Sequence, residues 1–186
     1  MGRLRYTAIC SLDGYVNDEH GEFGWAEPDE QVHRFVNERE RAVGTYLYGR
    51  RLYGVMSAWA DEGWLAGEQD FVQEYGRIWA AADKVVYSTT MSEVSTPRTR
   101  LEASFDPDAV AALKGSSERD ISVGGPALAV HAFAAGLVDQ VGLFLHPVVV
   151  GGGSRALPDG VRLHLDLVEE RRFDSGVVFL GYRVTS

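Results

Sequence analysis

The sequence predicts one α/β domain in three layers: a mostly parallel central sheet flanked by helices, followed by a C-terminal antiparallel hairpin. Three observations support this fold class. Strand-like and helix-like segments alternate three times along the chain, which is typical of parallel sheets covered by helices. Two more strand-like segments end the sequence and are joined by the turn Asp174-Ser175-Gly176. A length of 186 residues suits a single domain spanning 1–186.

The first strand is expected over residues 4–10, which are mostly apolar. The next segment, 11–28, is rich in glycine, proline and acids and is predicted to form a long loop. Loops of this length in a compact domain usually carry function. Asp29 is then a plausible N-cap of the first helix. The apolar stripe of that helix is expected to consist of Val32, Phe35, Val36 and Val43.

The middle of the chain continues this alternation. The expected elements are a strand at 45–48, a short helical turn at 50–59, a helix at 69–82, a strand at 84–88, an irregular segment at 92–105 with one short strand, and a helix at 106–115.

The last third begins with a strand over 120–123 that runs into Gly124-Gly125. Pro126 suits the first turn of a helix, and Gly136 suits its end. The remaining elements are a long apolar strand over 139–150, a turn at Gly151-Gly152-Gly153, and two strands near 162–173 and 176–184.

The composition excludes several classes of partner. The net charge is −9 and no block of lysine or arginine stands out, so we expect neither nucleic acid nor a membrane surface as a partner. The single cysteine, Cys10, cannot form an internal disulfide and suits a reduced, cytoplasmic setting. The five histidines lack metal-ligand spacing, so no metal site is expected.

The turn at Gly124-Gly125 is the first candidate site. Glycines let a phosphate approach the backbone, and the N–H groups at the start of the following helix favour an anion. The pattern is not GxGxxG, so the usual dinucleotide fingerprint is absent. A glycine pair between a strand and a helix is also an ordinary tight turn, and the sequence leaves both interpretations open.

Two further candidates follow neighbouring strands. Arg50 and Arg51 come directly after strand 45–48, and arginine forks suit phosphate oxygens. Ser88, at the end of strand 84–88, and Thr89 after it offer hydroxyls to a ribose phosphate. The alternatives are a solvated arginine pair and a polar turn. Because all these segments follow the carboxyl ends of strands, we expect them to meet at one edge of the sheet.

The long loop offers carboxylates beside an aromatic ring. Asp13, Trp25 and Glu30 lie within or just after it. Such a setting raises the pKa of a carboxyl group and stacks a flat heterocycle. The alternative for Asp13 is a structural role, in which it holds backbone N–H groups.

Several segments taken together resemble one known family. They are Ser11-Leu12-Asp13-Gly14, Gly49-Arg50-Arg51-Leu52-Tyr53, Val86-Tyr87-Ser88, Ile121-Ser122-Val123-Gly124-Gly125, Ala135-Gly136-Leu137-Val138-Asp139-Gln140 and Leu145-His146-Pro147-Val148-Val149-Val150-Gly151. In order and spacing they resemble the dihydrofolate reductase fold, and most of all its riboflavin-biosynthesis branch, the C-terminal reductase domain of the bifunctional deaminase–reductase. The deaminase half of that enzyme has no counterpart here.

This resemblance implies NADPH as the cofactor and a small heterocyclic substrate, 5-amino-6-(5-phosphoribosylamino)uracil. It also implies Asp13 and Glu30 as catalytic residues and Trp25 as a substrate-binding residue. The implied cofactor-binding residues are Gly49, Arg50, Arg51, Ser88, Thr89, Val123, Gly124, Gly125 and Leu128. Leu52 stands where many relatives have threonine, and Pro126 stands where a third glycine is common. Each departure removes one hydrogen bond to the cofactor, worth about 1 kcal/mol.

The leading hypothesis is therefore an NADPH-dependent reductase that transfers a hydride to a C=N or C=O type carbon. One alternative is a pteridine or dihydrofolate-type reductase. Another is a non-catalytic NADP-binding regulatory protein, which would bind the cofactor without turnover. The long apolar strand over 139–150 and the terminal hairpin offer an edge for pairing with a second copy, so we expect a homodimer.

Overall fold

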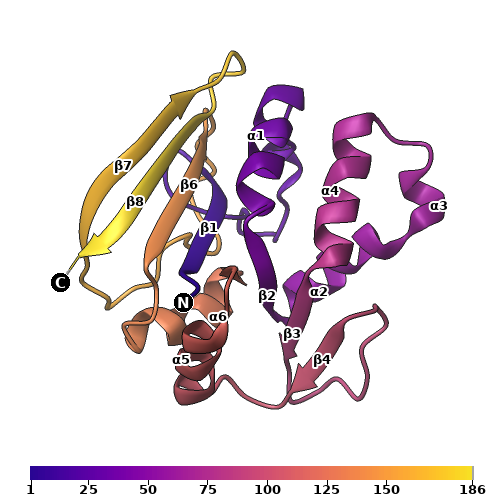
Figure 1. Cartoon of the computed structure of the whole chain (residues 1–186). Coiled ribbons are helices and arrows are strands. Elements are labelled where there is room, and N and C mark those ends of the chain that lie inside the picture. The colour runs from indigo at the N-terminus through magenta and orange to yellow at the C-terminus, as the bar shows by residue number, and fades with distance from the viewer. Residues whose placement is uncertain (186) are drawn as a thin grey trace.

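The computed structural model describes residues 1–185 and shows eight strands in one sheet (Figure 1). The strands are β1 (Leu4–Ser11), β2 (Val43–Gly49), β3 (Asp83–Tyr87), β4 (Thr99–Glu102), β5 (Asp120–Gly124), β6 (Gln140–His146), β7 (His164–Arg172) and β8 (Val178–Thr185). The helices are α1 (Glu30–Glu40), α2 (Arg50–Met56), α3 (Glu62–Leu65), α4 (Asp70–Ala81), α5 (Pro107–Ser116) and α6 (Pro126–Ala134). Two short 3-10 helices are η1 (Gly24–Ala26) and η2 (Ser57–Ala60).

The strand order is β4-β3-β2-β5-β1-β6-β8-β7. The pairings among the first six strands along the chain are all parallel, and β8 runs antiparallel to both β6 and β7. This confirms the predicted sheet with its C-terminal antiparallel hairpin. The short strand expected within 92–105 is β4, which pairs with β3 at the edge.

Helices cover both faces of the sheet, as the three-layer prediction requires. On one face, α5 and α6 contribute Val110 and Phe133 to a core that includes Ile121 of β5. On the other face, α4 packs Trp79 against the tyrosines of β2, and α1 packs Phe35 against β6 and β8. Figure 1 shows α1 and α4 together above the sheet and α5 and α6 together below it.

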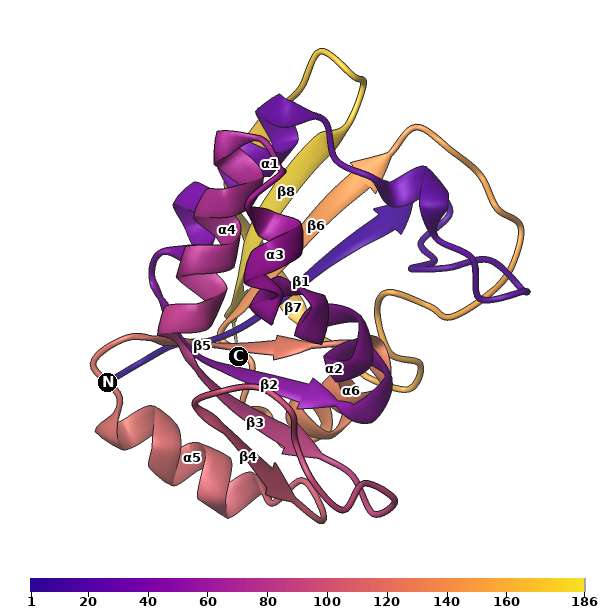
Figure 2. The same ribbon diagram turned by 90° about the vertical axis from the view of Figure 1, so that its right-hand side faces the viewer.

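The sheet opens between β1 and β5 toward their carboxyl ends. The β1–β5 pairing stops at Tyr6 opposite Val123, whereas β1 continues beside β6 until Ser11 faces His146. Figure 2 shows β1 and β6 running away from β5 and β2. In open α/β sheets, ligands bind where neighbouring strands separate in this way.

Two element boundaries and one additional helix differ from the sequence prediction. Val43, expected on the first helix, begins β2, because α1 ends at Glu40. The strand expected over 139–150 ends at His146, since Pro147 has no N–H to donate to a neighbouring strand. The short helix α3 was not expected. Its N-cap Asp61 accepts a hydrogen bond from the Trp64 backbone N–H.

None of the helices within residues 1–185 combines the length and the apolar character needed to cross a membrane.

Candidate active site

Strand register brings the three predicted cofactor-binding segments to one edge of the sheet. Gly49 at the end of β2 faces Tyr87 at the end of β3. Tyr48, one residue earlier, faces Gly124 at the end of β5. The turns that follow these strands are therefore neighbours. The structure thus places Arg50, Ser88 and Gly125 along one continuous edge.

Two helices begin at this edge, and both leave their first backbone N–H groups uncapped. Gly49 is the N-cap of α2 and Gly125 is the N-cap of α6, and within the described chain neither helix has a side-chain cap. Neither has an acid in its first turn, whereas α1, α3, α4 and α5 each carry one. The partial positive charge at both N-termini is therefore not neutralised locally, which favours an anion between them.

The residues at the start of α2 strengthen this positive potential. Arg50 and Arg51 occupy the first two positions of the helix, and both are exposed. A cation at a helix N-terminus is electrostatically unfavourable, by about 0.3–1 kcal/mol at an exposed site. A bound phosphate reverses that sign, because it interacts favourably with the guanidinium groups and with the helix end.

The glycine turn is compact and sterically constrained. Gly125 has a φ of 83°, a conformation that glycine adopts without strain. A Cβ added to Gly124 would lie 2.6 Å from Leu52 Cδ2 and 2.9 Å from Tyr48 Cε1. Val123 and Leu128 are buried on either side of the turn. Their burial anchors both ends of the turn in the core.

Ser88 is engaged in a local turn. Its Oγ accepts hydrogen bonds from the backbone N–H groups of Thr90 and Met91, both at 3.1 Å. The Ser88 Oγ also lies 3.3 Å from Thr90 Oγ1, in a hydrogen bond that either hydroxyl can donate. These contacts match the polar-turn interpretation. Thr89 is exposed beside it.

Asp13 ties two loops together. Its carboxylate accepts hydrogen bonds from the backbone N–H groups of Val150 at 3.2 Å and Gly151 at 2.8 Å. A hydrogen bond from Ser11 is the main cause that lowers the pKa of Asp13, and the two backbone N–H groups add to it. This ionised group fits the structural alternative, in which Asp13 holds the loop after β6 against the loop after β1.

A cavity of about 270 Å³ lies where β1 and β6 end beside the start of α1. Its walls include Trp25, Asp29 and His146, together with Ser175 and Val177 from the terminal hairpin. Asp29 is the N-cap of α1, and its Oδ1 accepts a hydrogen bond from Val32 N at 2.8 Å. That hydrogen bond is the main cause that lowers the pKa of Asp29. The cavity therefore carries an ionised carboxylate beside two aromatic rings.

The structure brings Asp29, rather than Glu30, to this cavity. Glu30 is exposed and accepts a hydrogen bond from Arg34 Nε at 2.8 Å. The predicted role of Glu30 stays a prediction, and the geometry favours its neighbour. Trp25 lines this cavity, and its predicted role in substrate binding stays a prediction.

His146 is the residue that the sequence analysis did not place in the site. It is 5% exposed, and its ring lies edge-to-face with that of Trp25 at a centroid distance of 6.0 Å. Burial lowers the pKa of His146, against smaller raising effects from the Trp25 backbone and Asp29. The available sequence signal was its position, directly before Pro147 at the end of an apolar strand.

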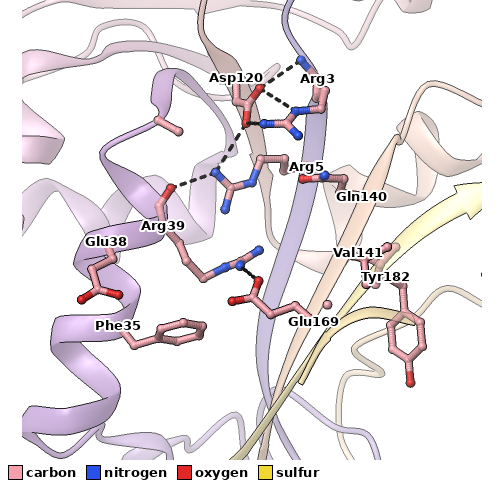
Figure 3. A pocket seen from close by; sticks show the side chains of 13 residues that line it. Arg3, Arg5, Phe35, Glu38, Arg39, Asp120, Gln140, Val141, Glu169 and Tyr182 are labelled. Atoms are coloured by element: carbon pink, nitrogen blue, oxygen red, sulfur yellow. Dashed lines mark hydrogen bonds and ion pairs between the residues drawn. The ribbon is translucent and has the colours of Figure 1, made fainter. Parts of the chain in front are cut away.

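A larger cavity, of about 380 Å³, lies at the amino ends of β1, β5 and β6 (Figure 3). Arg3 pairs with Asp120 at 2.9 Å, and Arg5 Nη1 lies 3.8 Å from the same carboxylate. Arg39 pairs with Glu169 of β7, and Arg5 also donates to the Arg39 carbonyl at 2.9 Å. Arg3 and Arg5 thus share one carboxylate, and Arg39 has its own, so each arginine already pairs with an acid of this chain. We assign this cavity a structural role.

Comparison with known proteins defines the fold class first. The chain has the fold of dihydrofolate reductase: the Enterococcus faecalis enzyme, solved with NADP(H), superposes with a TM-score of 0.65 at 12% identity, covering 100% of this chain and 98% of that one. A putative riboflavin biosynthesis protein from Shewanella sp. PV-4 superposes with a TM-score of 0.77 at 17% identity, covering 99% of both chains.

The family follows from the sequence itself. The model of the RibD C-terminal domain matches residues 3–179, and the chain belongs to that family. The uncharacterized protein YyaP of Bacillus subtilis is 30% identical over 184 residues, which cover 97% of this chain and 94% of that protein. The bifunctional deaminase and 5-amino-6-(5-phosphoribosylamino)uracil reductase of Thermotoga maritima superposes with a TM-score of 0.65 at 16% identity. The match covers 99% of this chain and 57% of that one.

Proposed function

We propose that this protein is an NADPH-dependent reductase of a small heterocyclic substrate. The observation that carries the proposal is the pair of uncapped helix N-termini at the ends of β2 and β5, with Arg50 and Arg51 at one of them. This arrangement suits a dinucleotide with several phosphates, because each phosphate meets backbone N–H groups or a guanidinium group.

The residues present fit such a cofactor. Gly124 and Gly125 let the pyrophosphate approach the start of α6, where Pro126 leaves one N–H fewer than usual. Arg50, with Arg51, Ser88 and Thr89 nearby, would hold the 2′-phosphate end. When bound, NADPH supplies the hydride. The protein's part is to position the two rings and to exclude water.

The substrate side is the cavity of about 270 Å³ beside α1. Trp25 offers a ring face or edge to a flat heterocycle, and Asp29 offers a carboxylate at its rim. We assign the orienting role to Asp29, with Asp13 supporting the adjacent loops. The family relationship favours 5-amino-6-(5-phosphoribosylamino)uracil as the substrate, with transfer of the hydride to a C=N or C=O carbon.

The test is a titration with NADPH and with NADH, followed by tryptophan fluorescence, in the wild type and in Arg50→Ala. We expect NADPH to bind more tightly than NADH and Arg50→Ala to remove most of that difference. Arg77→Ala, an exposed arginine on α4, is the matched control and should bind like the wild type. If neither nucleotide binds, the reductase proposal fails. If NADPH binds but no heterocycle is reduced, the protein is a non-catalytic NADP-binding regulator.

We also propose that the protein is a cytoplasmic homodimer. Leu165, Leu167 and Val168 of the edge strand β7 are 37%, 50% and 51% exposed, and a second copy would cover them. Sedimentation of the wild type and of Leu167→Lys tests this. We expect a dimer mass for the wild type and a monomer mass for the variant. A wild-type mass of one chain would refute the dimer.

A further inference from the structure

Two buried polar atoms in the substrate cavity lack a partner. Trp25 Nε1 and His146 Nε2 are both buried, and neither forms a hydrogen bond within residues 1–185. Both residues line the same cavity. A buried polar atom without a partner costs about 1–3 kcal/mol, and native proteins rarely leave one without a reason. Two in one cavity indicate a ligand that satisfies both.

The hydrogen-bonding character of the two atoms differs. The indole N–H of Trp25 only donates. The backbone of Trp25 raises the pKa of the His146 ring, which is the effect of a carbonyl that accepts from a ring nitrogen. Because Nε2 is the atom without a partner, Nδ1 carries the proton toward that carbonyl. The neutral ring then presents Nε2 as an acceptor.

A donor and an acceptor in one cavity suit a ligand edge that carries both an acceptor and a donor. A lactam edge, with its adjacent N–H and C=O, offers an acceptor to Trp25 and a donor to His146. Resting on the proposed reductase function, we propose that His146 is a specificity-determining residue, whose Nε2 accepts the ring N–H of a lactam-bearing heterocycle while Trp25 Nε1 donates to the adjacent carbonyl.

His33 provides an internal comparison. It is also buried, and its Nδ1 also lacks a partner within the described residues. Its ring, however, lies edge-to-face with Trp59, Phe71 and Tyr75 at centroid distances of 5.0–6.1 Å, inside an aromatic cluster between α1 and α4. His33 lines neither of the two cavities described above. His33 is therefore a core residue, and it supplies a control of the same type.

The test uses calorimetric titration with 6-aminouracil and with 1,3-dimethyl-6-aminouracil, which keeps the carbonyls but has no ring N–H. Each titration is run with and without saturating NADPH. The proteins are the wild type, His146→Phe, His146→Gln and the control His33→Phe, each verified as folded by urea unfolding. His146→Phe keeps the ring contact with Trp25 and removes both nitrogens. His146→Gln keeps an acceptor near the Nε2 position.

We expect 6-aminouracil to bind the wild type and His33→Phe equally, and to bind His146→Phe about tenfold more weakly. His146→Gln should recover most of the affinity. The dimethyl compound should bind the wild type more weakly than 6-aminouracil does, and its affinity should be the same for the wild type and for His146→Phe. Equal binding of 6-aminouracil by the wild type and His146→Phe overturns the assignment, as does an equal loss in His33→Phe or no binding to the wild type.

Acidification gives a second readout, because protonation turns Nε2 from an acceptor into a donor. The cavity wall also carries the acids Glu27 and Asp29, and the hydrogen bond from the Val32 backbone N–H lowers the pKa of Asp29. Affinity for 6-aminouracil should be constant above about pH 6.5 and fall as the pH drops below it in the wild type, because burial lowers the pKa of His146, and it should stay constant in His146→Gln. Parallel profiles refute the role of His146. Failure of NADPH to bind, with His146-dependent binding retained, refutes the reductase proposal alone.

Discussion

Replacing Gly124 with alanine tests the geometry of the glycine turn directly. Gly124 is buried, and an added Cβ would lie 2.6 Å from Leu52 Cδ2 and 2.9 Å from Tyr48 Cε1. Tyr48 cannot move aside easily. Its ring stacks on Tyr46 at 5.5 Å, and its hydroxyl accepts a hydrogen bond from Trp79 at 3.2 Å. Overpacking of this kind lowers the free energy of unfolding by about 1–3 kcal/mol.

Urea unfolding of the wild type and Gly124→Ala measures this change. Gly115→Ala is the matched control, because it makes the same substitution in α5 where an added Cβ meets nothing within 4 Å. Helix propensity predicts that the control gains up to about 1 kcal/mol. The two substitutions should therefore shift the midpoint in opposite directions.

A double variant separates the two contacts. Adding Leu52→Ala to Gly124→Ala removes the neighbour at 2.6 Å and leaves the Tyr48 ring in place. Neighbouring residues couple by about 0.5–3 kcal/mol, so part of the lost stability should return. If Gly124→Ala unfolds within about 0.5 kcal/mol of the wild type, a range typical of unconstrained surface positions, the steric argument is wrong.

Three further predictions concern residues outside the cofactor edge. Arg39→Met leaves Glu169 unpaired and should lower the free energy of unfolding by about 2 kcal/mol. This value lies between the costs of breaking an exposed and a buried ion pair, and urea unfolding measures it. Burial lowers the pKa of His33, so its contribution to stability is complete above about pH 6.5 and declines as the pH falls toward the folded-state pKa. His33→Gln should therefore lose less stability than the wild type between pH 7 and 5, and identical losses would refute this. Burial raises the pKa of Cys10 to about 11, so native protein at pH 8 should resist iodoacetamide while urea-unfolded protein reacts; rapid native labelling would contradict the burial.

The sequence predicted the sheet well because its signals are local. Apolar runs such as 4–10 and 120–123 mark buried parallel strands, and alternation with amphipathic helices determines their direction. Segments that follow such strands must share one edge, and the register of Gly49 with Tyr87 confirms it. Boundaries were harder to predict. Val43 fits a helical stripe and a strand equally well, and only the end of α1 at Glu40 decides between them.

The substrate side could not be predicted in the same detail, because it depends on non-local contacts. Asp29 and Glu30 are adjacent acids, and only the capping geometry shows that one reaches the cavity while the other pairs with Arg34. The unpartnered Nε2 of His146 shares its cavity with the unpartnered Nε1 of Trp25, and Trp25 is 121 positions earlier in the chain. The spacing of the histidines in the sequence was used only to test for a metal site, and it does not reveal that His146 lies beside Trp25.

Helix α1 extends from one cavity to the other. Asp29 caps it beside the cavity of about 270 Å³, and Arg39 of its last turn pairs with Glu169 of β7 in the larger cavity. With eleven residues, it is a rod of about 16 Å. Because the ion pair holds the C-terminal end of α1, it also limits the movement of the N-terminal end, where Asp29 lines the cavity. Substitution of Arg39 or Glu169 is therefore expected to change the rigidity of this cavity wall without changing any residue that lines the cavity.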